Sequence, residues 1–456
     1  MAISSAGVGS GLNVQSIVSQ LVAVESQPVK LMQAKGSTLQ TKMSAFGQIK
    51  AELAALQDAA NALTSASTWN SKTLTSSNAA AVTGTATTDA LASTFSINVG
   101  TLAKGQSVYS NSVTTGFPIA AAGTFTITSS NGNTQTVTLV GGETLDGFAA
   151  KVNATTTANG VSASVVTNSL GEKQLMFRSS SIGANAAFQI ATTSADLQQF
   201  AYAGTDTATM KRGSTASDAT ANIDGINVSG ANNTLGSSLP GVTLNLLQGS
   251  TTAQVTIAVD KDAIKAKIQA FQDAYNKLYA DLKTQTAYNA ATKTGGPLLG
   301  DNTATSMQSM LRTLVGGSGP ASSTIKRLSD LGLEIQSDGS LKTNSTKLDS
   351  ALQDPGNVKA FFAASTGTAS EKGIAKRVYD FAFGALSVGG SASSHISAFQ
   401  KAIDLNNKSI ARFNTHIEAY QKQLLSQYNA LDTNMAKLSS LSSYVSQQIT
   451  TWNKSS

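Results

Sequence analysis

The sequence predicts a multidomain α+β protein in which N- and C-terminal helices form a coiled-coil-like stalk, with β-rich head domains inserted between them. Three observations support this class. Apolar residues recur every seven positions near both ends, the middle alternates polar with apolar residues, and 456 residues suffice for about three domains. Only 13% of the residues are charged, so most polar positions are Ser, Thr, Asn, Gln or Gly, as in polar β surfaces and loops.

The N-terminal part predicts two helices. Residues 1–28 are expected to be a mobile segment containing a short amphipathic helix over about 12–26. The apolar face of that helix comprises Val14, Ile17, Leu21 and Val24. Pro28 suits the first turn of a helix, so a stalk helix is expected over about 29–63, within a segment 29–72. Its seam is the seven-spaced row Met32, Leu39, Phe46 and Leu53.

The middle of the chain predicts β structure. A β segment, 73–111, leads to a variable β-rich head domain, 112–217, which is followed by a further β-rich head segment, 218–260. Period-two alternation indicates strands at 93–99, 123–130, 134–140, 161–166 and 173–179. The Ala/Thr/Ser-rich passages near 76–92 and 204–221 lack periodicity and are interpreted as linkers or domain edges.

The C-terminal part returns to helical periodicity. Segment 261–400 is expected to be helical and mixed, leading back to the stalk, and 401–456 is expected to be a heptad helix with a mobile tail. The seam repeats every seven residues at Ile403, Ile410, Ile417, Leu424, Leu431, Leu438 and Val445. A long helix in an ordinary bundle is the alternative. Because neither terminal seam can be satisfied alone in water, we expect the two ends to pack together.

Candidate chemical sites are few. The stretch GVGSG at 7–11 lacks the third glycine of a dinucleotide loop and the Lys-Ser/Thr of a Walker loop, so no phosphate site is expected. With no Cys and only His395 and His416, no metal site is expected, and no carboxylate pair is singled out. The sequence therefore predicts neither an enzyme nor a cofactor.

The distribution of charge and hydropathy excludes further partner classes. The net charge of +6 is spread along the chain without a basic stripe, which argues against nucleic-acid binding. No run reaches the roughly 18 apolar residues of a membrane span, so no membrane partner is expected. The first basic residue is Lys30, so a cleaved secretory signal is not expected either.

Several long motifs, in order, resemble the bacterial flagellar filament cap family, also called hook-associated protein 2. They are GSGLNVQSIVSQLVAVESQPVKLM near the start, VGTLAKGQSVYSN (99–111), DATANIDGINVSGANNTLGSSLPGVTLNLL (218–247), FQDAYNKLYADLKTQTAYNAATKTGGPLLGD (271–301) and LSDLGLEIQSDGSLKTNSTKLDSAL (328–352). No family motif is evident over about 112–217.

The resemblance implies an extracellular cap at the tip of the flagellum, exported by the flagellar route without signal cleavage. Family members form a homo-oligomeric ring, most often of five subunits, whose terminal helices sit on the filament end while flagellin folds and inserts beneath. Hook–filament junction proteins and a dedicated export chaperone are implied as further partners. Adhesion to host mucin or glycans is a possible side activity of the unmatched middle.

Another flagellar axial protein, either a flagellin-like subunit or a hook–filament junction subunit, remains the alternative. Such proteins also pair terminal helices around a β-rich middle. The motifs at 218–247 and 271–301 favour the cap.

Overall fold

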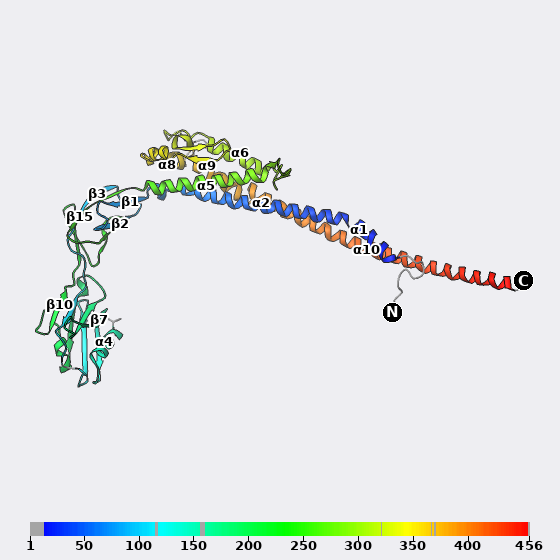
Figure 1. Cartoon of the computed structure of the whole chain (residues 1–456). Coiled ribbons are helices and arrows are strands. Elements are labelled where there is room, and N and C mark those ends of the chain that lie inside the picture. The colour runs from blue at the N-terminus through cyan, green and yellow to red at the C-terminus, as the bar shows by residue number, and fades with distance from the viewer. Residues whose placement is uncertain are drawn as a thin grey trace. The chain divides into compact units, whose positions relative to one another are not determined.

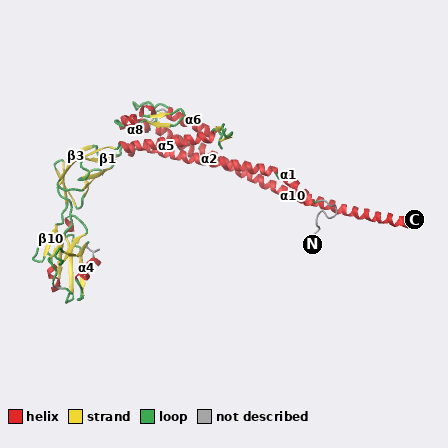
Figure 2. Cartoon of the chain, in the orientation of Figure 1, coloured by secondary structure: helices red, strands yellow, loops and turns green. Residues whose placement is uncertain are grey.

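The computed structural model describes residues 13–114, 117–155, 160–320, 322–365, 367–368 and 371–454. The chain forms two compact units. The first joins residues up to 65 to residues 265–456, and the second is the intervening stretch, 66–264. The first is mostly helical and the second carries most of the strands (Figures 1 and 2). This is the predicted α+β class, with a β-rich insertion between two helical ends.

The helical unit brings segments from both ends of the chain side by side (Figure 1). Its helices are α1 (Val14–Glu25), α2 (Gln27–Thr64), α5 (Lys261–Thr286), α6 (Asn302–Gly316), α7 (Ser345–Ala351), α8 (Pro355–Ala363), α9 (Ile374–Leu386) and α10 (Ser391–Lys454). Two hairpins, β16 (Tyr288–Asn289) with β17 (Thr294–Gly295) and β18 (Leu333–Ile335) with β19 (Leu341–Thr343), and the 3-10 turn η4 (Leu328–Leu331) complete it. α1 and α2 run antiparallel to α10.

Local sequence explains where these helices begin and which faces they bury. The side-chain oxygen of Asn13 accepts the Ser16 N–H at 3.0 Å and so caps α1. Pro28 lies in the first turn of α2, as predicted. The apolar face of α5 is buried at every position: Ile264, Ile268, Phe271, Tyr275, Leu278 and Leu282. These helices are therefore held by one-sided apolar packing.

The second unit contains two cores, each shared by antiparallel sheets. Its first elements are α3 (Ala66–Trp69), β1 (Lys72–Ser76), β2 (Val82–Ala86), β3 (Ser93–Val99), β4 (Ser107–Ser110), β5 (Gly123–Ser129), β6 (Thr134–Leu139), α4 (Leu145–Ala154), β7 (Val161–Thr167) and β8 (Lys173–Ser179). They are followed by η2 (Ala184–Ala186), β9 (Phe188–Thr192), η3 (Ala195–Phe200), β10 (Met210–Ser214), β11 (Ala219–Ile223), β12 (Ile226–Gly230), β13 (Thr234–Leu239), β14 (Val242–Leu246) and β15 (Thr251–Val259).

One core lies between a five-stranded sheet, β1-β15-β3-β11-β12, and a three-stranded sheet, β13-β14-β2. The other core is shared by β10-β4-β8-β7, β6-β5-β9 and α4. Five phenylalanines are buried in the second core: Phe125, Phe148, Phe177, Phe188 and Phe200. Because β4 and β10 pair in one sheet, the strands that surround this core begin at Ser107 and end at Ser214.

The five predicted strands are present as β3, β5, β6, β7 and β8. The interpretation of 76–92 and 204–221 as linkers or domain edges is wrong in its linker part, because the first contains β2 and the second contains β10 and part of β11. These strands lack the alternation of polar and apolar residues because many of their positions are small residues. A Cβ on Gly84 of β2 would lie 2.4 Å from the carbonyl oxygen of Thr243, so close strand approach requires glycine there.

Candidate assembly surface on the helical stalk

The stalk, defined here as α1, α2 and α10, packs most tightly where α2 meets the start of α10. Phe46 and Leu53 of α2 are buried. The Phe46 ring lies 4.6 Å from the His395 ring and 6.2 Å from the Phe399 ring, measured between centroids. Ile403, the first predicted seam residue of α10, is also buried. This part of the stalk has a continuous apolar and aromatic core.

The side chain of His395 connects this core to α6. Its Nε2 lies 2.6 Å from Oδ2 of Asp301. The other carboxylate oxygen of Asp301 caps α6 by accepting the N–H groups of Thr303 and Ala304 at 2.9 and 3.0 Å. His395 is thus a packing residue. Among the described residues, no group of three or more His, Cys, Asp or Glu side chains is placed to hold a metal ion.

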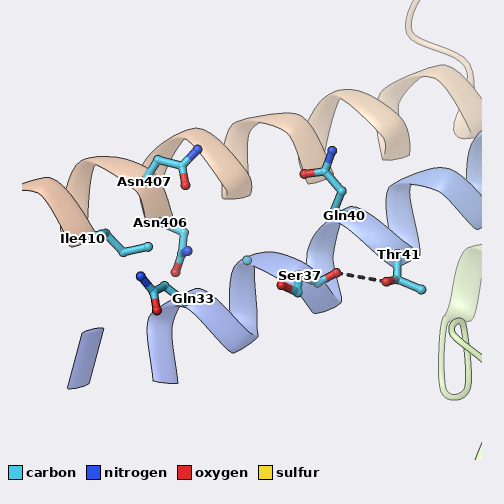
Figure 3. A pocket seen from close by; sticks show the side chains of 8 residues that line it. Gln33, Ser37, Gln40, Thr41, Asn406, Asn407 and Ile410 are labelled. Atoms are coloured by element: carbon cyan, nitrogen blue, oxygen red, sulfur yellow. Dashed lines mark hydrogen bonds between the residues drawn. The ribbon is translucent and has the colours of Figure 1, made fainter. Parts of the chain in front are cut away.

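Between α2 and α10, after the segment that contains Ile403, a layer of polar side chains interrupts the apolar seam (Figure 3). Asn406 is only 8% exposed, and its Nδ2 donates a hydrogen bond to the main-chain carbonyl of Met32. A Cβ on Gly36 would lie 3.1 Å from that Nδ2, so the glycine leaves room for the amide. Beside it lies a groove of about 470 Å³ lined by uncharged polar side chains, including Gln33, Ser37, Gln40, Thr41 and Asn407.

Beyond the polar layer, α1 takes over from α2 as the partner of α10. Val14 and Val18 of α1 are buried with Leu424 of α10. Val22, Tyr420, Leu425 and Tyr428 pack around them. At the other end of α1, Glu25 lies 3.5 Å from the imidazole Nε2 of His416. The seam is therefore covered as far as Leu424 and Tyr428.

The same seam continues along α10 past the end of α1, where the described part of the chain leaves it exposed (Figure 1). The exposed fractions are 45% for Leu431, 41% for Met435, 59% for Leu438, 46% for Val445 and 52% for Ile449. Their spacing keeps them on one face of the helix. We call this row the open seam.

The predicted stalk residues divide between buried and exposed positions. Phe46, Leu53, Ile403 and Leu424 are buried, whereas Met32, Leu39, Ile410 and Ile417 are half-buried. Leu431, Leu438 and Val445 belong to the open seam. In the N-terminal helix, Val14 is buried and Ile17 is half-buried, but Leu21 and Val24 are exposed because α1 turns Val18 and Val22 toward α10. The glycine stretch at 7–11 lies outside the described residues, and mobility of 1–28 stays a prediction.

Sequence reasoning missed the polar layer. A signal was present, because Phe413 and Tyr420 form a second seven-spaced row beside the seam, and Asn406 stands seven positions before Phe413. A polar residue in a core row marks a position that specifies register.

No helix among the described residues is both long and apolar enough to cross a membrane.

Comparison with protein families identifies the two flanking parts of the chain. The model of the flagellar hook-associated protein 2 N-terminus matches residues 10–106, and that of its C-terminus matches residues 216–440. The chain belongs to the flagellar hook-associated protein 2 family. The C-terminal match includes α10 as far as residue 440, and so covers Leu431, Met435 and Leu438 of the open seam. A third model, the flagellin hook IN motif, matches residues 124–181. Neither hook-associated protein 2 model covers residues 112–215, in agreement with the expectation for this stretch, but the flagellin motif found there was not anticipated.

Relatives match along nearly their whole length. A-type flagellar hook-associated protein 2 of Pseudomonas aeruginosa is 27% identical, and the alignment covers 97% of this chain and 96% of the relative. Flagellar hook-associated protein 2 of Escherichia coli strain K12 is 28% identical, with 98% of each chain covered. The crystal structure of the D1-D2-D3 domains of the flagellar cap protein FliD from Escherichia coli aligns with a TM-score of 0.57 at 26% identity. That alignment covers 78% of this chain and 99% of the solved chain.

Proposed function

We propose that this chain is the structural cap at the distal end of a bacterial flagellar filament. There it promotes the folding and insertion of exported flagellin and prevents its loss to the medium. The observation that carries the proposal is the open seam, which continues a helix–helix interface beyond the point where α1 covers it. An apolar row on a helix surrounded by water needs a partner, and the end of a filament supplies one.

The family membership supports the cap role over the alternative axial subunit. Both flanking family models are those of hook-associated protein 2, and the solved relative from Escherichia coli is a flagellar cap protein. The flagellin-like or junction-subunit alternative predicts a different location in the filament.

We further propose the arrangement that the resemblance implies. Copies of the chain assemble as a ring, with five as the expected number, at the extracellular tip of the flagellum after export without a cleaved signal peptide. The stalks grip the filament end through the open seam, and flagellin enters beneath the ring. Hook–filament junction proteins and an export chaperone are the other expected partners. Adhesion to mucin or glycans stays a prediction, to be tested by binding assays with the full chain.

Electron microscopy of labelled protein tests the location. A cap gives one label at the free end of each filament, whereas an axial subunit gives label along the length and a junction subunit gives label at the base. Cells lacking the chain should be non-motile, with short or missing filaments and flagellin in the medium. Normal filaments in such cells would contradict the proposal.

A further inference from the structure

Two carboxylates from different helices each place one oxygen out of contact with solvent where α5 packs on α2. Glu52 of α2 is only 6% exposed. Lys277 and Asp281 of α5 are the charged groups that act on it, and they lie one helical turn apart, so both face α2. Oε2 of Glu52 and Oδ2 of Asp281 are both shielded from solvent, and neither has a hydrogen-bond partner among the described residues.

The polar neighbours of this pair reach only the other oxygen of each carboxylate. The Gln48 amide donates to Oε1 of Glu52 at 3.4 Å, and Nζ of Lys277 lies 4.0 Å from the same atom. The Lys277 side chain is 74% exposed, so its attraction is screened by water. The Gln285 amide donates to Oδ1 of Asp281 at 3.2 Å. If both carboxylates were ionised, two buried anionic oxygens would remain without a donor, which is costly.

A proton on Glu52 removes this cost at its source. A neutral Glu52 carboxyl carries an O–H and no longer places a negative charge out of contact with water. Two negative charges near one another also disfavour ionisation of both groups. We propose that Glu52 holds a proton in the folded chain, and that this makes the α2–α5 contact a pH-sensitive joint that tightens as the pH falls.

The electrostatics of the site agree in direction. Burial raises the pKa of Glu52 above its ordinary value, and the negative charge of Asp281 raises it further. The Gln48 hydrogen bond and Lys277 act in the opposite direction with smaller effect. The folded pKa is therefore above the unfolded one. The resulting stability is fully present below the unfolded pKa and is lost as the pH rises through the folded pKa.

Unfolding of the full chain, followed by the far-ultraviolet helical signal between about pH 5 and about pH 8, tests the proposal. A bound proton changes the folding equilibrium by up to about tenfold per pH unit. Glu52→Gln supplies a permanent neutral donor of the same shape. It should therefore be more stable than the wild type at the alkaline end, with the difference closing at the acid end. Asp58→Asn, at an exposed carboxylate on the same helix, should parallel the wild type.

Asp281→Asn provides an independent arm. It removes the second charge, so it should reproduce the effect of Glu52→Gln, and the double variant should add little to either single change. If the Glu52→Gln chain fails to fold, Asp281→Asn and a carboxyl-carbon NMR titration of Glu52 in the wild type still decide the question.

Three results would overturn the proposal. Glu52→Gln could be less stable than the wild type at the alkaline end, which would make the ionised Glu52–Lys277 pair the stabilising element. The pH dependence of Glu52→Gln could parallel that of the wild type. Finally, Mg²⁺ or Ca²⁺ could stabilise the wild type but not Glu52→Gln, with reversal by EDTA, which would put a cation in place of the proton. These measurements do not depend on the cap function.

Discussion

The side-chain amide of Asn406 on α10 donates a 2.9 Å hydrogen bond to the main-chain carbonyl of Met32 on α2. Asn406 occupies the row that continues as Phe413 and Tyr420, so a polar group stands at a core position of the stalk. In paired helices such a residue fixes register at a cost in stability. We therefore expect Asn406 to set how α2 and α10 align.

Replacing Asn406 with Leu tests this role. The variant loses a hydrogen bond with a net value of about 1 kcal/mol but gains apolar burial of similar size, so overall stability should change little. Its register should become less specific. Hydrogen exchange in α2 should then show two populations where the wild type shows one, while Asn407→Leu at the exposed neighbouring position should not. A single population in Asn406→Leu would contradict the assignment.

Gly36 and Gly47 form a matched pair within α2. Alanine at either position should gain about 0.5–1 kcal/mol from helix propensity. A Cβ at Gly47 meets nothing within 4 Å, whereas one at Gly36 approaches the Asn406 amide to 3.1 Å. Gly47→Ala should therefore raise the melting temperature, and Gly36→Ala should raise it less or lower it. Equal gains in both variants would show that the Asn406 contact does not need the glycine.

The open seam should matter for assembly but not for the fold of a single chain. Leu438→Asp places a carboxylate at a position that is 59% exposed, so the free energy of unfolding should remain within about 0.5 kcal/mol of the wild-type value. Cells carrying it should be non-motile and release flagellin. Ser440→Asp, off the seam on the same helix, is the control. Normal swimming of Leu438→Asp cells, at wild-type export, would refute the role of the open seam.

Ile417→Asp tests the covered part of the seam. Ile417 is half-buried, so the change should both weaken the stalk, by up to about 1.5–3 kcal/mol, the value for a fully buried side chain, and release flagellin into the medium. Ser426→Asp at an exposed position should be nearly silent. A stable Ile417→Asp chain in normally swimming cells would show that this stretch of the seam is not needed for capping.

A pH effect of opposite sign to that of Glu52 is expected at Glu143. Hydrogen bonds from Lys151 and from the main-chain N–H of Val140 lower the pKa of Glu143 to about 2. The stabilisation is therefore present above the unfolded pKa of about 4.3 and is lost as the pH falls toward the folded value. Glu143→Gln should be less stable than the wild type near neutral pH, with the difference vanishing in strong acid. Asp89→Asn, at an exposed site, should show no such convergence in the same denaturation series.

The helical architecture was predictable because one physical requirement controls it. A narrow apolar row on a helix must be covered, so burial of Phe46, Leu53 and Ile403 could be expected from their spacing. Strands with regular alternation were predictable for the same reason. Where the packing depends on small residues, as at Gly84, no alternation is left to detect.

The polar details of the stalk were not predictable in the same way. The pairing of Asn406 with Met32 depends on the relative register of two helices, which spacing within either helix does not determine. The orientation of α1 about its own axis could not be predicted from the sequence either. Val14, Ile17, Leu21 and Val24 form a valid apolar face, but contact with Leu424 buries Val14 together with Val18 and leaves Leu21 and Val24 exposed. The face of α1 that becomes buried depends on the surface of α10, and the local sequence of α1 contains no information about that surface.

The pairing of α2 with α10 joins residues 374 positions apart at Asn406 and Met32. Contacts of such high sequence separation require closure of a very long loop, and the chain must incur that entropy before the stalk gains any packing. During synthesis from the N-terminus, α1 and the first half of α2 therefore have no α10 to pack against until the last helix has been made. The stalk is the part of the molecule that can fold only after translation of α10, so it should be the last part of the chain to acquire native structure.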